Sequence, residues 1–123
     1  MRGWSFIREG VRGLTLLAVS MGGSGCHSYQ VETTVENRTG TAVQLVEVDY
    51  PSASFGADSM AAGADLHYRI QIRGTGPVKV QYTSADGRQE QISGPELTER
   101  QQGRLRIVLL PGGKAEFYPE LTR

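Results

Sequence analysis

Cysteine, histidine and tryptophan are nearly absent from this 123-residue chain. The single cysteine, Cys26, excludes an intramolecular disulfide, and two histidines, His27 and His67, are too few for a zinc site of the His/Cys type. The formal net charge is +0 and the basic residues form no cluster, which argues against an electrostatic nucleic-acid binder. We therefore expect no metal, no cofactor and no nucleic-acid partner.

A hydrophobic run long enough to span a membrane is also lacking. The longest mostly apolar run is Leu14–Met21, far shorter than the ~20 residues of a transmembrane helix. It follows a basic segment with Arg2, Arg8 and Arg12, and this order is typical of an export signal. The sequence predicts a signal peptide with a short helix over residues 1–25. The remainder is long enough for one domain.

Small residues lead from the apolar run to the cysteine. The segment Gly23-Ser-Gly-Cys26 resembles the lipobox of bacterial lipoprotein precursors, in which an aliphatic residue, two small residues and a cysteine follow one another. Ser24 and Gly25 match this pattern, whereas Gly23 stands where the aliphatic residue is usual. The resemblance implies cleavage between Gly25 and Cys26, a diacylglyceryl group on the Cys26 thiol, and a short tether over 26–29.

The resemblance to small bacterial envelope lipoproteins also implies a location. The acylated protein, carrying palmitate or similar chains, would be anchored at the periplasmic face of a membrane, because two or three acyl chains bind a protein stably to a bilayer. His27 follows the cysteine in place of the Asp that retains lipoproteins in the inner membrane of enteric bacteria, which favours the outer membrane. Two alternatives remain open: soluble export after a cut behind Ala18-Val-Ser20, and an uncleaved signal anchor.

The rest of the chain shows the period-two alternation of β-strands and almost no helical periodicity. We predict an all-β fold over residues 30–121: an antiparallel two-sheet β-sandwich of immunoglobulin-like type with about seven short strands. A small barrel is the alternative. The expected strands are 31–36, 42–50, 67–73, 77–84, 88–93, 105–109 and 114–118.

Breaks in the alternation have separate interpretations. Leu45 beside Val46 indicates a bulge or a strand buried on both faces. Pro51 makes 51–56 an irregular or edge segment, with Phe55 in the core. Glycine-containing turns are expected at 37–40, 61–64, 74–77, 86–87 and 111–113.

No catalytic motif is present. Ser52, Ser54 and Ser59 lie near Asp58 without a nucleophile elbow, and we expect His67 to face solvent from a strand rather than act as a base. We therefore name no catalytic residue and do not expect an enzyme. An Asn-Arg-Thr glycosylation sequon at 37–39 is interpreted as incidental in an exported bacterial protein.

Three basic residues, Arg69, Arg73 and Lys79, are predicted to form a positive strip on adjacent strands, with Glu47 and Asp49 nearby. Such a strip is either cross-strand charge pairing or a docking face for an acidic partner. We expect a non-enzymatic binding or structural module that docks an envelope protein, for example at an exposed sheet edge. The alternative is a small periplasmic enzyme or carrier with a site in loops 51–64 and 94–103.

Overall fold

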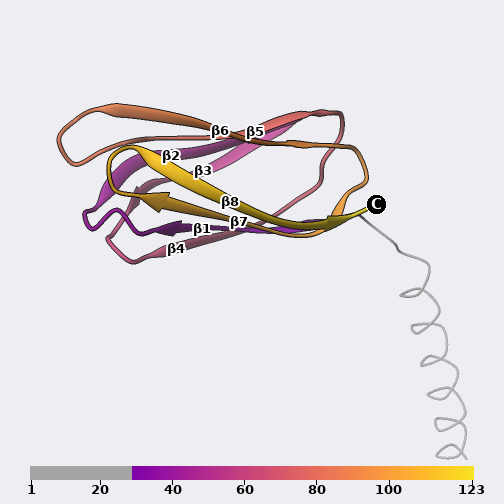
Figure 1. The fold of residues 1–123 in the computed structure, drawn as a ribbon, viewed down its shortest axis with the longest axis horizontal. Helices are drawn as coiled ribbons and strands as arrows, with labels where there is room; N and C mark the ends of the chain where they lie inside the picture. The colour runs from indigo at the N-terminus through magenta and orange to yellow at the C-terminus, as the bar shows by residue number, and fades with distance from the viewer. Residues whose placement is uncertain (1–28) are drawn as a thin grey trace, which may run out of the picture.

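The computed structural model describes residues 29–123, which form eight β-strands (Figure 1). They are β1 (Val31–Asn37), β2 (Val43–Tyr50), β3 (Ala53–Met60), β4 (Asp65–Ile70), β5 (Gly76–Thr83), β6 (Gln89–Leu97), β7 (Gln102–Leu110) and β8 (Lys114–Thr122). No described residue is helical. The predicted signal helix falls on residues that the structure does not describe.

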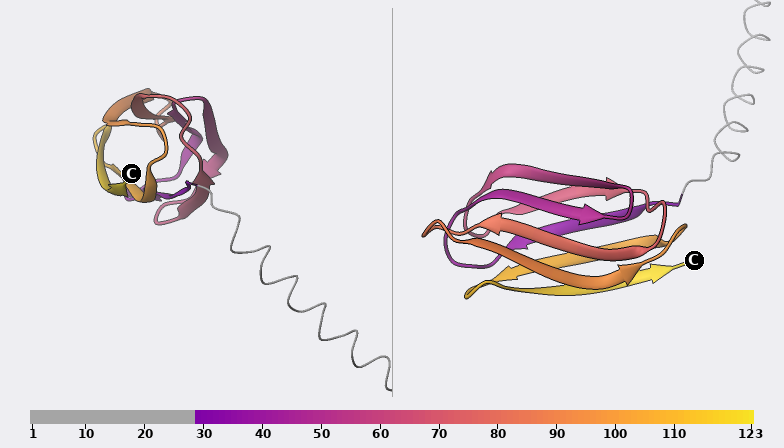
Figure 2. Two further views of the ribbon diagram at one scale, coloured as in Figure 1. Left: turned by 90° about the vertical axis from the view of Figure 1, so that its right-hand side faces the viewer. Right: turned by 90° about the horizontal axis from the view of Figure 1, so that it is seen from above.

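The strands form two four-stranded sheets packed face to face, so the predicted β-sandwich is confirmed (Figure 2). Sheet A has the order β4-β1-β7-β8 and sheet B has the order β3-β2-β5-β6. Two features differ from the expectation. β3 is an eighth strand at the edge of sheet B, and β1 and β7 pair in parallel, whereas all other pairs are antiparallel.

The core lies between the inner faces of the two sheets and is built by the alternation seen in the sequence. In β1, for example, Val31, Thr33 and Val35 are fully buried while Glu32 and Thr34 face outward. Phe55 is buried, as predicted. The central buried side chains are Val31, Val35, Val43, Val48, Val78, Val80, Leu97, Leu105, Ile107 and Leu109. Residues 31–121 thus contain a complete core of their own.

Asn37 joins two of the connections in which the chain crosses from one sheet to the other. The β1–β2 and β3–β4 connections lie side by side, because the Asn37 backbone exchanges hydrogen bonds with Gly63 and Ala64. The fully buried Asn37 side chain donates to the carbonyl oxygens of Thr41 (2.9 Å), Met60 (3.2 Å) and Ala61 (3.0 Å). Its Oδ1 accepts from the backbone N–H and hydroxyl of Thr39. The amide of the sequon is therefore a structural group of the folded domain.

The break at Leu45 is a β-bulge. The β2–β5 register shifts between Gln44 and Glu47, and Leu45 takes a positive φ of 51° with its side chain exposed. A Cβ placed on the facing Gly56 of β3 would lie 2.0 Å from the Val46 carbonyl oxygen. Glycine at this position lets the neighbouring strand pass the bulge.

β4 ends earlier than predicted, at Ile70, and Tyr68 is half exposed instead of fully inward. Its ring stacks on Phe55 with centroids 4.7 Å apart, so this pair closes one side of the sandwich between β4 and β3. On the other side, an added Cβ at Gly94 of β6 would meet the Phe117 ring of β8 at 2.6 Å. Aromatic side chains therefore cover the gap between the two sheets on both sides of the sandwich.

Both described ends of the chain lie at the same end of the sandwich (Figure 1). We call it the tether end; it carries residues 29–30, the connections at 51–52, 71–75 and 98–101, and Arg123. The opposite end, the far end, carries the connections at 38–42, 61–64, 84–88 and 111–113.

Candidate functional site

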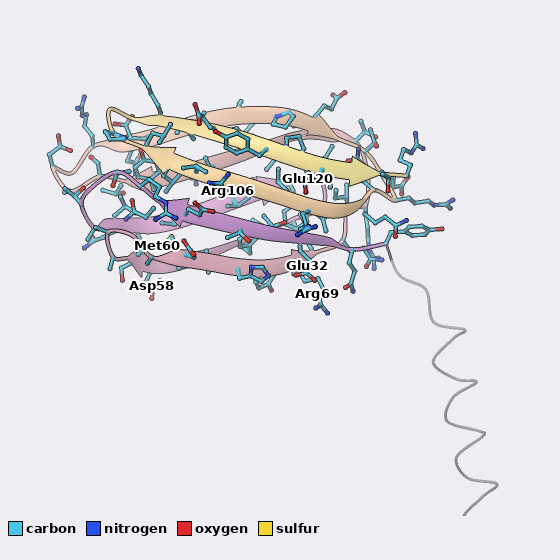
Figure 3. All side chains as sticks on the ribbon, turned by 60° about the horizontal axis from the view of Figure 1, so that its bottom comes forward. Glu32, Asp58, Met60, Arg69, Arg106 and Glu120 are labelled. Carbon is cyan, nitrogen blue, oxygen red and sulfur yellow. The ribbon has the colours of Figure 1, made fainter. Side chains whose placement is uncertain are left out.

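The outer face of sheet A carries rows of charged and polar side chains. The register aligns Arg69, Glu32, Arg104 and Glu120 from β4, β1, β7 and β8, so positive and negative groups alternate across all four strands. Figure 3 labels Arg69, Glu32 and Glu120 of this row. Arg69 Nε lies 2.7 Å from Glu32 Oε2, and Arg104 Nε lies 3.8 Å from Glu120 Oε1. All four side chains are substantially exposed, so each ion pair contributes little to stability.

Glu36 is the most buried charge on this face. Its carboxylate accepts from Arg106 Nε at 2.6 Å and from Arg38 Nη2 at 3.0 Å, and its side chain is only 11% exposed. The hydrogen bond from Arg106 holds the pKa of Glu36 below its usual value, although partial burial opposes this shift. Arg106 also lies over the ring of Tyr118, 5.0 Å from its centroid.

His67 faces outward from β4, as the alternation predicted. Its Nε2 lies 3.1 Å from Glu32 Oε1 and its Nδ1 lies 2.9 Å from the Thr34 hydroxyl. A neutral ring with its proton on Nε2 satisfies both contacts, because Nε2 donates to the carboxylate and Nδ1 accepts from the hydroxyl. His67 is therefore engaged in cross-strand bonding.

A shallow depression of about 360 Å³ runs over this face between β4 and β8. Residues that line it include Glu32, Glu36, His67, Arg106 and Tyr118. Among its described lining residues there is no serine, cysteine or lysine, and the arginines already contact carboxylates. Its hydroxyl–imidazole contact is that of Thr34 with His67, and the lining as a whole offers charged and hydrogen-bonding groups for polar surface contact.

The predicted positive strip is not formed, because its residues are not on adjacent strands. Arg69 lies on β4 in sheet A, Lys79 lies on β5 in sheet B, and Arg73 lies in the connection between them. Arg69 is paired with Glu32, and Lys79 stands opposite Asp49 on β2. Arg73 donates to the side chain of Gln71. Alternation identified the outward faces correctly but gave no strand order.

The loops named for an enzyme or carrier site are mostly strands. β3 occupies most of 51–64, while β6 and β7 leave only 98–101 of the segment 94–103 as a connection. Ser54 and Asp58 line a depression on sheet B, whereas His67 lines the one on sheet A. The residues considered for a hydrolytic site therefore belong to different surfaces.

The exposed leucine at the β2 bulge was not predicted from the sequence. Leu45 is 62% exposed and lines two shallow depressions on sheet B, one toward β3 and one toward β6. The first also contains Glu47, Ser54, Gly56 and Asp58. The phase break beside Val46 indicated the bulge, but not which of the two residues would face solvent.

The residues predicted to carry the lipid anchor and its processing site, Gly25 and Cys26, lie outside the described residues. Within 29–123, no helix is long and apolar enough to cross a membrane, and no group of three His, Cys, Asp or Glu side chains is placed to hold a metal ion.

Comparisons with known proteins support the fold alone. No family model and no curated protein matches the chain. An NMR structure of a protein from Eubacterium rectale is similar, with a TM-score of 0.54 and 12% sequence identity over 76% of this chain and 93% of that one. At this identity the likeness is one of architecture.

Proposed function

We propose that this protein is a lipid-anchored module of the bacterial cell envelope that binds or braces another envelope protein and catalyses no reaction. Support for the anchor comes from the basic segment, the short apolar run and the small residues before Cys26. Acylation would hold Cys26 at the periplasmic face of a membrane, and His27 favours the outer membrane over the inner.

The observation that carries this proposal is that a complete core begins directly behind the anchor position. Cys26 precedes Val31 by five residues, so their Cα atoms are at most about 18 Å apart. The tether end would therefore lie close to the bilayer. With strands of up to nine residues, the far end would stand roughly 30 Å farther out.

A binding role is favoured over catalysis by the kind of surface that the described residues present. The hollows on both sheets are shallow, and His67 and the sheet A arginines contact neighbouring side chains. Each sheet also has two edge strands, whose outer main-chain groups can pair with a further strand.

The anchor can be tested in cells grown with an alkyne-bearing fatty acid. We expect the wild type to be labelled and to sediment with membranes, and Cys26→Ser to be unlabelled and soluble. Gly23→Leu, which supplies the aliphatic residue of the lipobox, should increase the labelled fraction. If the wild type is unlabelled and the mass of the mature protein corresponds to a chain that begins at Met21, the protein is instead cut behind Ser20 and released.

The binding role can be tested with a photocrosslinking amino acid in the intact envelope. We expect a discrete adduct from an exposed position on an edge strand, such as Ser54, and none from Arg104, which lies on the inner strand β7 within the ion-paired row. Adducts of equal yield from both positions would contradict a defined docking surface.

A further inference from the structure

The four edge strands of the sandwich differ in how they are protected against pairing with another chain. β6 and β8 contain Pro95 and Pro119, which cannot donate to a further strand. β4 has only six residues, with Asp65, His67 and Arg69 among them. β3 has eight residues, no proline, no lysine or arginine, and a single charge. It is the edge on which the usual devices against strand addition are missing.

The surface beside β3 is accessible. Ser54, Gly56 and Asp58 are exposed, and within the described part of the chain β3 pairs only with β2. The depression along its outer face has a volume of about 720 Å³, and the Leu45 side chain borders it. Leu45 keeps a strained positive φ in an exposed position, where it adds little to the core. An apolar contact is thus available next to a free edge.

Sheet B differs from sheet A in its balance of charged residues. The four strands of sheet B contain one basic residue, Lys79, against five acidic ones: Glu47, Asp49, Asp58, Glu90 and Glu96. Lys79 stands opposite Asp49, and Glu47 is bonded to the uncharged amide of Gln81. No basic side chain is paired with Glu47 or Asp58 among the described residues, whereas the ion pairs of sheet A engage arginines.

We propose that β3 is a docking edge for an extended, basic segment of a protein partner. The segment would continue sheet B beyond β3 through main-chain hydrogen bonds, which supply affinity in strand addition. Its outward side chains would alternate with the pleat, so that Lys or Arg face Glu47 and Asp58 and an apolar residue packs on Leu45. This inference extends the proposed binding role to one strand and one partner chemistry, and it does not depend on the lipid anchor.

The test uses the segment 27–123 with two blocked nonapeptides, one alternating Lys with Val and one alternating Glu with Val. We expect the basic peptide to shift the backbone NMR signals of β3 and β2, and the acidic peptide to leave them unchanged. Asp58→Lys should weaken binding of the basic peptide about tenfold. The matched control Glu99→Lys makes the same charge change on an exposed turn at the tether end and should leave binding unchanged.

A basic peptide with alternate backbone nitrogens methylated should lose binding, because methylation removes its main-chain donors while its charges remain. Equal binding of this peptide would overturn strand addition. The proposal also fails if the acidic peptide binds equally, if the shifts map to β6 or β8, or if no shift occurs at about 1 mM peptide. Concentration-dependent dimerisation with β3 shifts in the absence of peptide would identify a second copy as the occupant instead. The unacylated segment is used throughout, so this result and the fatty-acid labelling can fail independently.

Discussion

Replacing Asn37 should destabilise the domain far more than replacing an exposed amide. Asn37→Ala removes a donor shared by three carbonyl oxygens and an acceptor for two Thr39 groups, all at a fully buried position. Each lost hydrogen bond costs about 1 kcal/mol net, and water can replace those that lie toward solvent, so we expect the free energy of unfolding to fall by roughly 3 kcal/mol. For a domain of this size that lowers Tm by roughly 15 °C.

Urea unfolding of residues 27–123 followed by far-UV circular dichroism measures this change, with an unaltered m-value expected. Gln44→Ala, which removes an exposed amide from β2, is the matched control and should change stability by less than about 0.5 kcal/mol. Asn37→Asp keeps the Thr39 contacts but cannot donate at neutral pH, so it should be at least as destabilising as Ala. An Asp variant as stable as the wild type would refute the view that the donated bonds hold the corner.

Three further outcomes are expected. Gly56→Ala should destabilise the domain by more than about 2 kcal/mol, because the added Cβ would lie 2.0 Å from the Val46 carbonyl oxygen. Leu45→Gly relieves a positive φ and should change the stability by less than about 1 kcal/mol. Thermal melts of the two variants compare these effects. Phe55→Ala should cost about 3 kcal/mol in urea unfolding, since it empties a core position and breaks the stack that closes the β3–β4 side; a cost under about 1 kcal/mol would contradict this packing role. Arg106 lowers the pKa of Glu36 in the folded state, so this pair stabilises the fold above the ordinary glutamate pKa of 4.5 and the contribution is lost as pH falls through the folded value. Glu36→Gln should therefore flatten the acid side of a stability–pH profile, and a profile of unchanged slope would show that the ion pair is not the cause.

The strands that alternate clearly were predictable, whereas β3 was foreseen only as an irregular or edge segment over 51–56 and was not counted as a strand. In β5 the alternating Val78 and Val80 define the buried face, and in β1 Val31, Thr33 and Val35 do so. β3 is rich in Ala, Ser and Gly, residues with low β propensity, and follows Pro51. The hydrogen bonds with β2 hold this segment as a strand, although its own composition does not favour one. The bulge at Leu45 could be predicted, because a residue beside Val46 disturbed an otherwise regular pattern.

The outward-facing residues of each strand were predictable, but the strands that lie next to one another, and so the residues that share a surface, were not. The sequence placed Glu32 on an outward face and Arg106 on another, yet the parallel pairing of β1 with β7 that brings these faces together joins distant parts of the chain. The same lack of strand order produced the incorrect strip, since Arg69 and Lys79 are close in sequence but belong to different sheets. The lipid anchor at Cys26 stays a prediction from the sequence.

The parallel β1–β7 pair has a consequence for how the domain is made. Val31 is aligned with Gly103, so the second neighbour of the first strand is synthesised about seventy residues after it. The β2–β3 and β5–β6 hairpins need only local chain closure and can form early. The β1–β7 pair in the middle of sheet A must wait for residue 110, and contacts of such sequence separation fold on the millisecond-to-second scale. During synthesis β1 therefore has no strand partner until β4 is complete at residue 70, and its other edge stays open until β7 is complete at residue 110. A chaperone that recognises apolar extended segments would find its target there.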